Sequence, residues 1–454
     1  AMSSIRDPRA AVPPVGDGLP LLHAADSDRV VLWRGHVPLR ARQFLAEVEA
    51  VAARLPPRRQ LLNLCEQRDR FLVAFGAGLV RGQGNLLPPS RAPQVLGELA
   101  AAWPDHHACD DDLDAFAAAH AGPGPDASPR VAGGHVAAIG FTSGSTGHPR
   151  QHLKTWAAFA AGSRRNAQAI TAALGTQGLR GDPALVATVP PQHMYGMELS
   201  VLLPLMSAFA VHAGRPLLPA DIAQALSEVP APRVLVSTPV HLRALLAAGL
   251  DLPTLGLVVC ATAPLDAEVA AAVERRFGAP LLEMFGATET CVIAQRRTAV
   301  EEAWTLYDDV ALHAGPDGTR VEAPWFAEAN TLQDVVEQLP GRRFVLRGRN
   351  VDLVEIAGKR ASLAELTRRL LALPGVRDAV VVQPEAAPGE GVRRLAALVV
   401  APGATTAGLL AQLRDTVDPA FMPRPLLLVD ALPRNAVGKL PREALLAALG
   451  RKDA

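Results

Sequence analysis

A repeated alternation of short apolar runs with helical patterns constrains this chain more than any other feature. The apolar runs, each bounded by turn residues, are 135–141, 184–189, 234–236 and 257–260. The helical patterns between and after them are 155–174, 220–226, 240–248 and 266–276. Strands that alternate with helices imply crossover connections and a largely parallel sheet that is covered on both faces. We therefore predict an α/β fold of layered, largely parallel sheets flanked by helices.

The pattern changes after about residue 345. The order becomes helix 362–373, strand 377–383, strand 394–400, helix 406–416 and strand 426–429. This is an α+β module of roughly 105 residues, which is large enough to fold as a domain. A chain of 454 residues is also too long for one simple core. We expect a large N-terminal domain over 1–347 and a small α+β domain over 348–454.

Charge and lysine content narrow the class of function. The chain has 45 basic and 45 acidic residues. This balance argues against a protein that binds nucleic acid, which needs a concentrated basic surface. Only four of the basic residues are lysines, at positions 154, 359, 439 and 452. A lysine on a motif position is therefore informative.

The cysteines and the apolar segments bear on location. Cys65, Cys109, Cys260 and Cys291 form no C-x-x-C pair, so they indicate neither a disulfide framework nor a zinc site. The first residues contain no apolar signal core, and the longest apolar stretch, 199–211, is shorter than the roughly 18 to 20 residues of a membrane span. We expect a cytoplasmic protein without a membrane span.

The strongest local signal is the segment 141–150, FTSGSTGHPR, directly after a predicted strand. Two glycines and four hydroxyl residues in six positions suit a loop whose N–H groups and hydroxyls surround a polyphosphate. A plain Gly/Ser linker is the alternative. Neither Gly-Lys pair, at 358–359 or 438–439, has the context of a Walker A loop.

This segment resembles the phosphate loop of the adenylate-forming ligase superfamily, which includes acyl- and aryl-CoA synthetases, luciferases and peptide-synthetase adenylation domains. Four more segments resemble motifs of that superfamily in the same order. They are PPQHMYG at 190–196, EMFGATE at 283–289, the hinge-like stretch 348–365, and LPRNAVGKLPR at 432–442. The similarity covers roughly residues 30 to 450.

The resemblance implies an ATP-dependent ligase that makes an acyl-adenylate and then a thioester, with Mg²⁺ as a cofactor and CoA or phosphopantetheine as the acceptor. A mobile C-terminal domain would carry the catalytic lysine. The implied ATP-binding residues are Thr142, Ser143, Gly144, Ser145, Thr146, Gly147 and Arg150 at the phosphates, Ala261, Thr262, Ala263, Phe285 and Gly286 at adenine, and Asp334 and Arg349 at ribose. The implied catalytic residues are Lys439, Thr288, Glu289 and His193, with Glu289 also holding Mg²⁺.

Two roles also have a physical argument. A compact ammonium at Lys439 can reach both a carboxylate and the α-phosphate as a point charge, which a planar guanidinium does less well. Gly358 matches the place where a pantetheine arm passes close to the backbone, because a missing Cβ leaves clearance there. Arg360 matches the residue that reaches the phosphate after the small domain rotates.

The chain departs from the family pattern at several positions. Val351 stands at the hinge position, Glu355 replaces a frequent Lys, and Ala261-Thr262 replaces Gly-Gly. These changes bear on the rotation step and remove no adenylation group. Gly286 and Ala287 are small and predict room for an aromatic ring or a slim acyl chain.

Several alternatives stay open from the sequence. The acid is aryl or aliphatic, the acceptor is CoA or an acyl carrier protein, and His193 either gates the carboxylate or is a packed histidine. A non-catalytic nucleotide-binding relic of the same fold is the second function class. The run 106–112, HHACDDD, superficially resembles a metal cluster but is expected to be a solvated acidic loop. Gly76 and Gly78 lie in a helical pattern, which argues against a dinucleotide site.

Overall fold

The computed structural model describes residues 18–23, 28–88, 91, 93–112, 125, 127–142, 150–175, 181–315, 318–326, 328–332, 334–349, 353–356, 359–384, 394–435 and 438–450. Its contacts divide the chain into two compact units. Unit 1 comprises residues 1–302, 307–309 and 324–327, and unit 2 comprises 303–306, 310–323 and 328–454. The predicted boundary between 347 and 348 concerns which segment rotates, and it stays a prediction.

Unit 1 contains a large, mostly parallel sheet in the order β15-β14-β13-β12-β10-β11-β2-β3. The six strands from β14 to β2 run parallel to their neighbours, and β15 and β3 are antiparallel additions at the two ends. The strands are β2 (Val30–Arg34), β3 (Val37–Arg40), β10 (Ala184–Ala187), β11 (Ala210–His212), β12 (Arg233–Ser237), β13 (Leu257–Cys260), β14 (Leu281–Ala287) and β15 (Cys291–Arg296).

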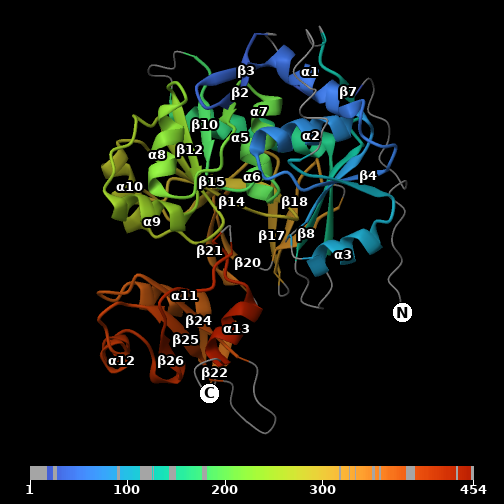
Figure 1. The fold of residues 1–454 in the computed structure, drawn as a ribbon. Coiled ribbons are helices and arrows are strands. Elements are labelled where there is room, and N and C mark those ends of the chain that lie inside the picture. Colours follow the sequence, from blue (N-terminus) through green and yellow to red (C-terminus); the bar gives the residue numbers. More distant parts are fainter. Residues whose placement is uncertain are drawn as a thin grey trace. The chain divides into compact units, whose positions relative to one another are not determined.

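Three helices cover one face of this sheet: α8 (Pro219–Ser227), α9 (Pro239–Ala248) and α10 (Ala267–Phe277), as Figure 1 shows. Their apolar side chains share one buried cluster with the strands, in which Ile222, Leu242 and Val273 meet Leu235 and Val258. Burial of this kind stabilises by about 25 cal/mol per Å² of apolar surface. It accounts for the continuous apolar runs that predicted these strands.

Unit 1 also contains a second sheet in the order β6-β4-β5-β8-β9. Its first four strands are parallel, and β9 pairs antiparallel with β8. The strands are β4 (Gln60–Asn63), β5 (Gly84–Leu87), β6 (His106–Cys109), β8 (Val136–Thr142) and β9 (Arg150–Thr155), and a separate pair is formed by β1 (Leu19–Pro20) and β7 (Arg130–Val131).

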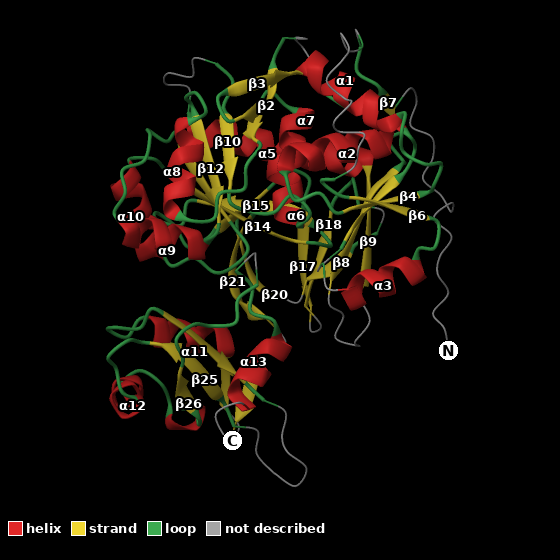
Figure 2. Ribbon diagram, viewed as in Figure 1, coloured by secondary structure: helices red, strands yellow, loops and turns green. Residues whose placement is uncertain are grey.

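The other helices that the structure describes in unit 1 surround these sheets (Figure 2). They are α1 (Ala41–Ala52), α2 (Arg68–Val80), α3 (Pro93–Ala102), α5 (Trp156–Leu174), α6 (Met194–Met197), the π-helix η1 (Glu198–Leu202) and α7 (Leu203–Met206). The predicted loop 141–150 therefore leads into strand β9 before helix α5 begins. The helical pattern around Gly76 and Gly78 is confirmed as α2. No described helix is long and apolar enough to cross a membrane.

Unit 2 is built from small antiparallel sheets and one α+β core. The order β20-β21-β16 forms one group of strands, β17-β18-β19 a second, and β22-β23 a hairpin. The C-terminal core joins a three-stranded sheet, β24-β25-β26, to helices α11 and α12 through a cluster that includes Leu370, Val381, Val399 and Leu413. This core confirms the order of elements predicted after residue 345.

The bounds in unit 2 are as follows: β16 (Trp304–Leu306), β17 (Ala311–Gly315), β18 (Gly318–Glu322), β19 (Asn330–Leu332), β20 (Asp334–Leu339), β21 (Arg343–Arg349), β22 (Leu353–Ile356), β23 (Lys359–Ser362), α11 (Leu363–Leu371), β24 (Asp378–Val382), β25 (Ala396–Val400), α12 (Thr406–Arg414), the 3-10 helix η3 (Pro419–Phe421), β26 (Leu426–Leu428) and α13 (Arg442–Gly450).

Candidate active site

Three of the predicted motif segments follow neighbouring parallel strands of the large sheet. The segment 190–196 follows β10, 261–263 directly follows β13, and 285–289 begins at the end of β14. Their registers align these ends, with β12 between β10 and β13. Ligands of open α/β sheets bind outside the carboxyl ends of the strands. The fold therefore gathers these segments at one edge, which we call the carboxyl edge.

Gly140 brings the second sheet to the carboxyl edge. A Cβ on Gly140 would lie 3.0 Å from Cγ2 of Thr288 and 3.2 Å from Cε of Met194. Three motif segments that are distant in sequence therefore meet at this glycine of β8. The phosphate-loop prediction from Ser143 to Gly147 lies outside the described residues. Its flanking residues Thr142 and Arg150 are direct partners in the β8–β9 ladder.

Strand β9 turns a basic face toward Glu289. Arg150, His152 and Lys154 alternate along the strand and so lie on the same side of it. Burial lowers the pKa of His152, the Glu289 carboxylate opposes this, and the charges of Lys154 and Arg150 lower the pKa further. The side chain of His152 thus lies in the electrostatic field of the residue predicted to hold Mg²⁺.

The turn 287–292, which carries Thr288 and Glu289, is held by hydrogen bonds from inside the protein. Lys154 Nζ donates to the carbonyl oxygen of Glu289 at 2.5 Å. Both carboxylate oxygens of Glu198 accept from the Val292 amide, at 3.0 and 3.1 Å. The Ala287 amide donates to Thr290 Oγ1 at 3.1 Å. The position of this turn is therefore set by buried groups.

The outer side of the turn offers ligand atoms. Within the part of the chain that the structure describes, no hydrogen bond or ion pair engages the Glu289 carboxylate or the Thr288 hydroxyl. Both residues are partly exposed. Carboxylate oxygens are ligands that Mg²⁺ prefers, and Mg²⁺ is usually held by one or two carboxylates together with substrate phosphates. The described residues contain no group of three or more His, Cys, Asp or Glu able to cage a metal. This donor set fits a nucleotide-bound Mg²⁺.

The segment predicted to line adenine contains a strained residue. Thr262 has a φ of +87°, a conformation that is uncommon for a β-branched residue. It stands where the family pattern has glycine, which adopts such angles freely. Backbone strain of this kind clusters at ligand sites. Ala261 before it is buried, and Phe285 lies half-buried in β14.

The room expected at Gly286 is not available on the side of its missing Cβ. A Cβ there would lie 2.1 Å from the carbonyl oxygen of Cys291. The glycine is therefore required by the close approach of β15, at a bulge between Phe285 and Gly286. The role of Gly286 near adenine stays a prediction.

The segment after β10 is tied to its neighbours through hydroxyl and imidazole groups. The Tyr195 hydroxyl donates to the carbonyls of Ser237 and Val259, both at 3.2 Å. Thr188 Oγ1 lies 3.1 Å from Ser237 Oγ, and His241 Nδ1 lies 2.8 Å from Thr238 Oγ1. The carboxyl ends of β10, β12 and β13 thus share polar contacts. His193 lies half-buried directly before α6, and its gating role stays a prediction.

Unit 2 contains the predicted ribose and lysine residues. Asp334 of β20 and Arg349 of β21 are direct partners in an antiparallel ladder, so both residues predicted at ribose lie side by side along the backbone. Arg360 lies in β23, where its backbone pairs with Glu355. Gly358 and Val351 lie outside the described residues.

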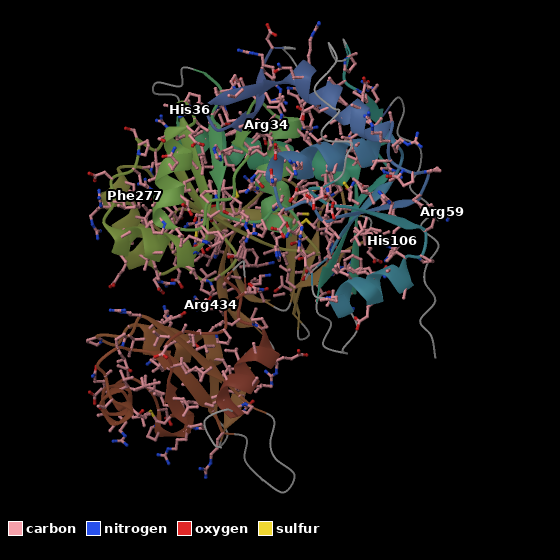
Figure 3. The ribbon with its side chains drawn as sticks, in the orientation of Figure 1. Arg34, His36, Arg59, His106, Phe277 and Arg434 are labelled. Atoms are coloured by element: carbon pink, nitrogen blue, oxygen red, sulfur yellow. The ribbon has the colours of Figure 1, made fainter. Side chains whose placement is uncertain are left out.

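Lys439 is exposed on a loop that an ion pair anchors. Arg434, labelled in Figure 3, binds both oxygens of Asp378 at 2.7 and 2.8 Å and donates to the Gly438 carbonyl at 2.7 Å. The Lys439 amide donates to Asn435 Oδ1 at 2.9 Å. The backbone before and at Lys439 is therefore fixed by side chains of the same unit.

Sequence reasoning missed Lys154 and Glu198. Lysine scarcity had already singled out Lys154 as one of four. The alternation of Arg150, His152 and Lys154 was the signal for a strand with a basic face. Glu198 carries a weaker signal, because a single acid within the apolar run PPQHMYGMELSVLLP is expected to have a buried partner.

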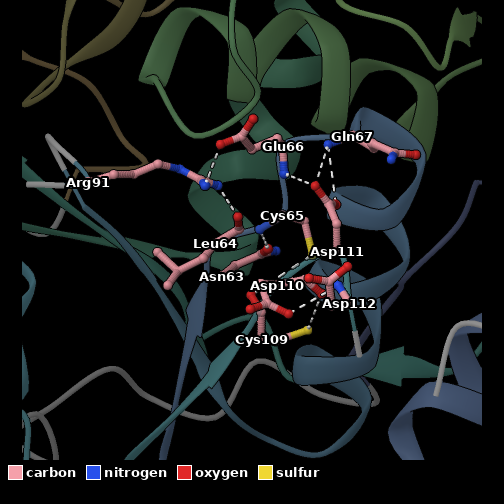
Figure 4. A network of polar contacts seen from close by, with 10 residues as sticks. All are labelled: Asn63, Leu64, Cys65, Glu66, Gln67, Arg91, Cys109, Asp110, Asp111 and Asp112. Atoms are coloured by element: carbon pink, nitrogen blue, oxygen red, sulfur yellow. Dashed lines mark hydrogen bonds and ion pairs between the residues drawn. The ribbon is translucent and has the colours of Figure 1, made fainter. Parts of the chain in front are cut away.

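The run 106–112 has a structural explanation (Figure 4). Its first four residues form strand β6, so the expectation of a solvated loop was wrong there. Asp111 accepts hydrogen bonds from the amides of Glu66 and Gln67 just before helix α2, including one of 2.9 Å from Glu66. A carboxylate in this position satisfies donors before a helix and favours its N-terminus.

Residues 87–317 match the model of the AMP-binding enzyme family, and residues 366–439 match the AMP-binding enzyme C-terminal domain. The chain therefore belongs to the AMP-binding enzyme family. This confirms the resemblance to adenylate-forming ligases.

Relatives within the family differ in how much of them this chain covers. A 4-coumarate–CoA ligase of Halorhodospira halophila is 30% identical over 325 residues, which span 67% of this chain and 75% of the relative. Enterobactin synthase component F of Shigella flexneri is 29% identical over 244 residues, or 42% of this chain and 19% of that protein. The fold resembles that of ATP-bound MatB from Rhodopseudomonas palustris, with a TM-score of 0.76, 19% identity, and coverage of 94% of this chain and 97% of MatB.

Proposed function

We propose that this protein is an ATP-dependent carboxylate ligase, which forms an acyl-adenylate with release of pyrophosphate and then passes the acyl group to a pantetheine thiol. The convergence of β8, the segment after β10 and the Thr288–Glu289 turn at Gly140 carries the proposal. It brings the strand that leads into the phosphate-loop segment to the edge where the family's nucleotide motif lies. Membership of the AMP-binding family supports the same reaction.

In the first step a carboxylate oxygen of the acid attacks the α-phosphorus of ATP. The bond to the bridging oxygen breaks and pyrophosphate leaves. Because both reactants are anionic, catalysis depends on positioning and charge neutralisation. Thr288 would bond the α-phosphate, and the basic face of β9 adds positive charge beside it. Glu289 would hold Mg²⁺, which when bound would supply positive charge that offsets the charge of the phosphates.

Lys439 would neutralise the reacting carboxylate and α-phosphate from unit 2. The loop from Thr142 to Arg150 would hold the β- and γ-phosphates, and Asp334 and Arg349 would bind the ribose hydroxyls. In the second step the thiol sulfur attacks the adenylate carbonyl and AMP leaves. Gly358 and Arg360 would serve this step after the domain 348–454 rotates. A bulky substitution of Gly358 is expected to spare adenylation and block thioester formation.

The substrate is a carboxylic acid of the aryl or small to medium acyl class. The relation to a 4-coumarate–CoA ligase supports placing hydroxycinnamates first in a substrate screen, followed by benzoates and fatty acids. Free CoA and a phosphopantetheinylated acyl carrier protein are the two acceptors to compare. The cytoplasmic location stays a prediction.

The test is release of pyrophosphate from ATP that depends on an added acid. Release that requires both the acid and Mg²⁺, followed by thioester formation with one acceptor, would support the proposal. The competing function is a nucleotide-binding relic of the same fold. ATP binding without pyrophosphate release across the whole acid screen would favour that relic and contradict the ligase.

A further inference from the structure

Lys154 is a buried lysine beneath the turn 287–292. Its residue is 7% exposed, and its ammonium donates to the Glu289 carbonyl. Removing an ammonium from water costs several kcal/mol unless partners compensate. An apolar side chain would fill the same space without that cost. Packing alone therefore does not account for a lysine at this position.

A second buried charge holds the other end of the turn. Both carboxylate oxygens of Glu198 accept a hydrogen bond from the Val292 amide. Oε1 of Glu198 also accepts one from Asn166 Nδ2 at 3.3 Å. Asn166 in turn accepts the Tyr307 hydroxyl at 2.9 Å. The buried side chains of Lys154 and Glu198 thus bind peptide groups three residues apart, on either side of Thr290.

The turn between these charges is strained. Cys291 has a φ of +61°, and a non-glycine residue held there costs of order 1–3 kcal/mol and persists only when its surroundings fix it. Loss of one anchor would let the turn relax. The side chains of Thr288 and Glu289 would move with it, and a displacement of about 1 Å at a reacting site can lower the rate about 10²-fold.

We propose that Lys154 is a positioning residue, which fixes the Glu289 carboxylate for Mg²⁺ and Thr288 for the α-phosphate through its bond to the Glu289 carbonyl. The inference rests on the proposed function, because Glu289 is the metal ligand there. Groups that orient a metal ligand typically change metal affinity about 10- to 100-fold when they are removed. Lys154 is expected to act in that range.

Arg29 offers a matched control in the same unit. It is a buried cation, 8% exposed, whose guanidinium donates to the carbonyls of His23 at 2.7 Å and Pro204 at 2.8 Å. The variants Lys154→Met and Arg29→Met therefore each remove a buried cation that binds backbone carbonyls. Only the first touches the turn.

The experiment measures ATP affinity by calorimetry with and without Mg²⁺, and acid-dependent pyrophosphate release in parallel. Lys154→Met should lose roughly tenfold or more of the Mg²⁺-dependent gain in ATP affinity. Its metal-free affinity should stay close to wild type. Arg29→Met should keep the full gain, and Lys154→Arg, which keeps a charged donor, should recover part of it.

A double-mutant cycle separates positioning from a general loss of structure. If Lys154 acts through Glu289, Lys154→Met should add little further loss in a Glu289→Gln background, because the effects of mutating two residues in one hydrogen-bond network are not additive. Equal losses in both backgrounds, or a wild-type Mg²⁺ gain in Lys154→Met, would overturn the inference.

Folding is checked by thermal unfolding, with Lys154→Gln as a second neutral variant. If neither neutral variant shows a cooperative transition, the residue serves stability and the positioning role is refuted. The proposed function is judged separately on the wild-type protein. A wild type that binds Mg²⁺–ATP but releases no pyrophosphate contradicts the ligase while the binding cycle still decides the role of Lys154. A wild type with no Mg²⁺-dependent ATP binding overturns both.

Discussion

The turn 287–292 of unit 1 and the loop 432–441 of unit 2 carry the two halves of the proposed chemistry, and they are held in different ways. The turn is gripped by Lys154 and Glu198, both buried. In the loop, Lys439 is exposed, and the anchor is the Arg434–Asp378 pair, whose side chains are 21% and 26% exposed. Among the described residues, buried side chains hold the turn, whereas partly exposed side chains hold the loop.

The difference suits the different roles that we propose for the turn and the loop. Burial of charges in a region of low dielectric makes their interactions strong and their loss costly. It suits ligand atoms that must stay in place. A bidentate ion pair near the surface fixes the orientation of the groups it joins but contributes less free energy than a buried pair. It suits a lysine whose proposed role is to reach a substrate from a separate unit.

The largest expected effect is that of Lys439→Ala. It should lower acid-dependent pyrophosphate exchange about 10²- to 10³-fold, as for removal of one charge-stabilising donor, while ATP still binds. Steady-state exchange and nucleotide calorimetry measure the two properties. Arg414→Ala, at an exposed cation of the same unit, should leave exchange unchanged. A wild-type rate of exchange in Lys439→Ala would show that Lys439 takes no part in adenylation.

Gly140→Ala tests the approach of the two sheets in unit 1. The added methyl would lie 3.0 Å from Thr288 Cγ2, so Thr288 must shift, and we expect about a tenfold loss of kcat/KM. Gly162→Ala in helix α5 is the matched control, because no atom lies within 4 Å of its new Cβ. It should keep full activity. Equal rates in both variants would contradict the placement of Thr288.

Arg434→Ala should loosen the loop without removing Lys439. We expect about a tenfold lower kcat and little change in ATP affinity, because the Arg434 guanidinium positions the backbone of the loop before Lys439. Asp378→Asn should produce a similar loss, and the double variant should be no worse than either single one. Additive losses would show that the pair does not act as one anchor.

The smallest effect concerns pH and the stability of the turn's buried acid. Burial raises the pKa of Glu198 from 4.5 to about 7, while Val292, Asn166 and the charge of Lys154 oppose the rise. The folded state therefore holds this proton more tightly than the unfolded state. The contribution of Glu198 to stability falls as pH rises from about 4.5 to 7, by up to about 3 kcal/mol.

Glu198→Gln removes this titration. Its free energy of unfolding relative to wild type should improve between pH 5 and pH 8, as followed by urea unfolding. Burial, together with the charge of Glu198, raises the pKa values of Tyr195 and Tyr307 well above their usual range, so these tyrosines do not titrate in this window. A constant difference between the two proteins across it would show that Glu198 is ionised throughout.

The sequence predicted the core strands well and strand β9 not at all. Strand 257–260 was placed to the residue, since its side chains are buried on both faces and form a continuous apolar run. In β9 the polarity is inverted, because Lys154 is buried while Leu153 is 46% exposed. Alternation in that strand therefore gives no apolar face to recognise. Such local conflicts are expected at functional positions.

The site residues also divide into those that the sequence predicted and those that it did not. Thr288, Glu289 and Lys439 lie in motifs that a family resemblance can carry to this chain. Lys154 and Glu198 belong to no quoted motif. Their importance comes from contacts between residues 135 and 94 positions apart in the chain, which a sequence pattern does not contain. The strands between 311 and 349 were also missed, because short antiparallel strands with charged residues resemble loops.

The strand order β14-β13-β12-β10 has a consequence for how such a chain can diversify. The proposed nucleotide groups follow β13 and β14, whereas the contacts of Thr188, Ser237 and His241 lie at the ends of β10 and β12. Because the proposed gate of the acid, His193, follows β10, we expect substitutions at the latter ends to affect the preferred acid more than the turn that Lys154 holds. We therefore expect one end of the sheet to tolerate substitution or redesign while the other keeps the groups of the proposed reaction.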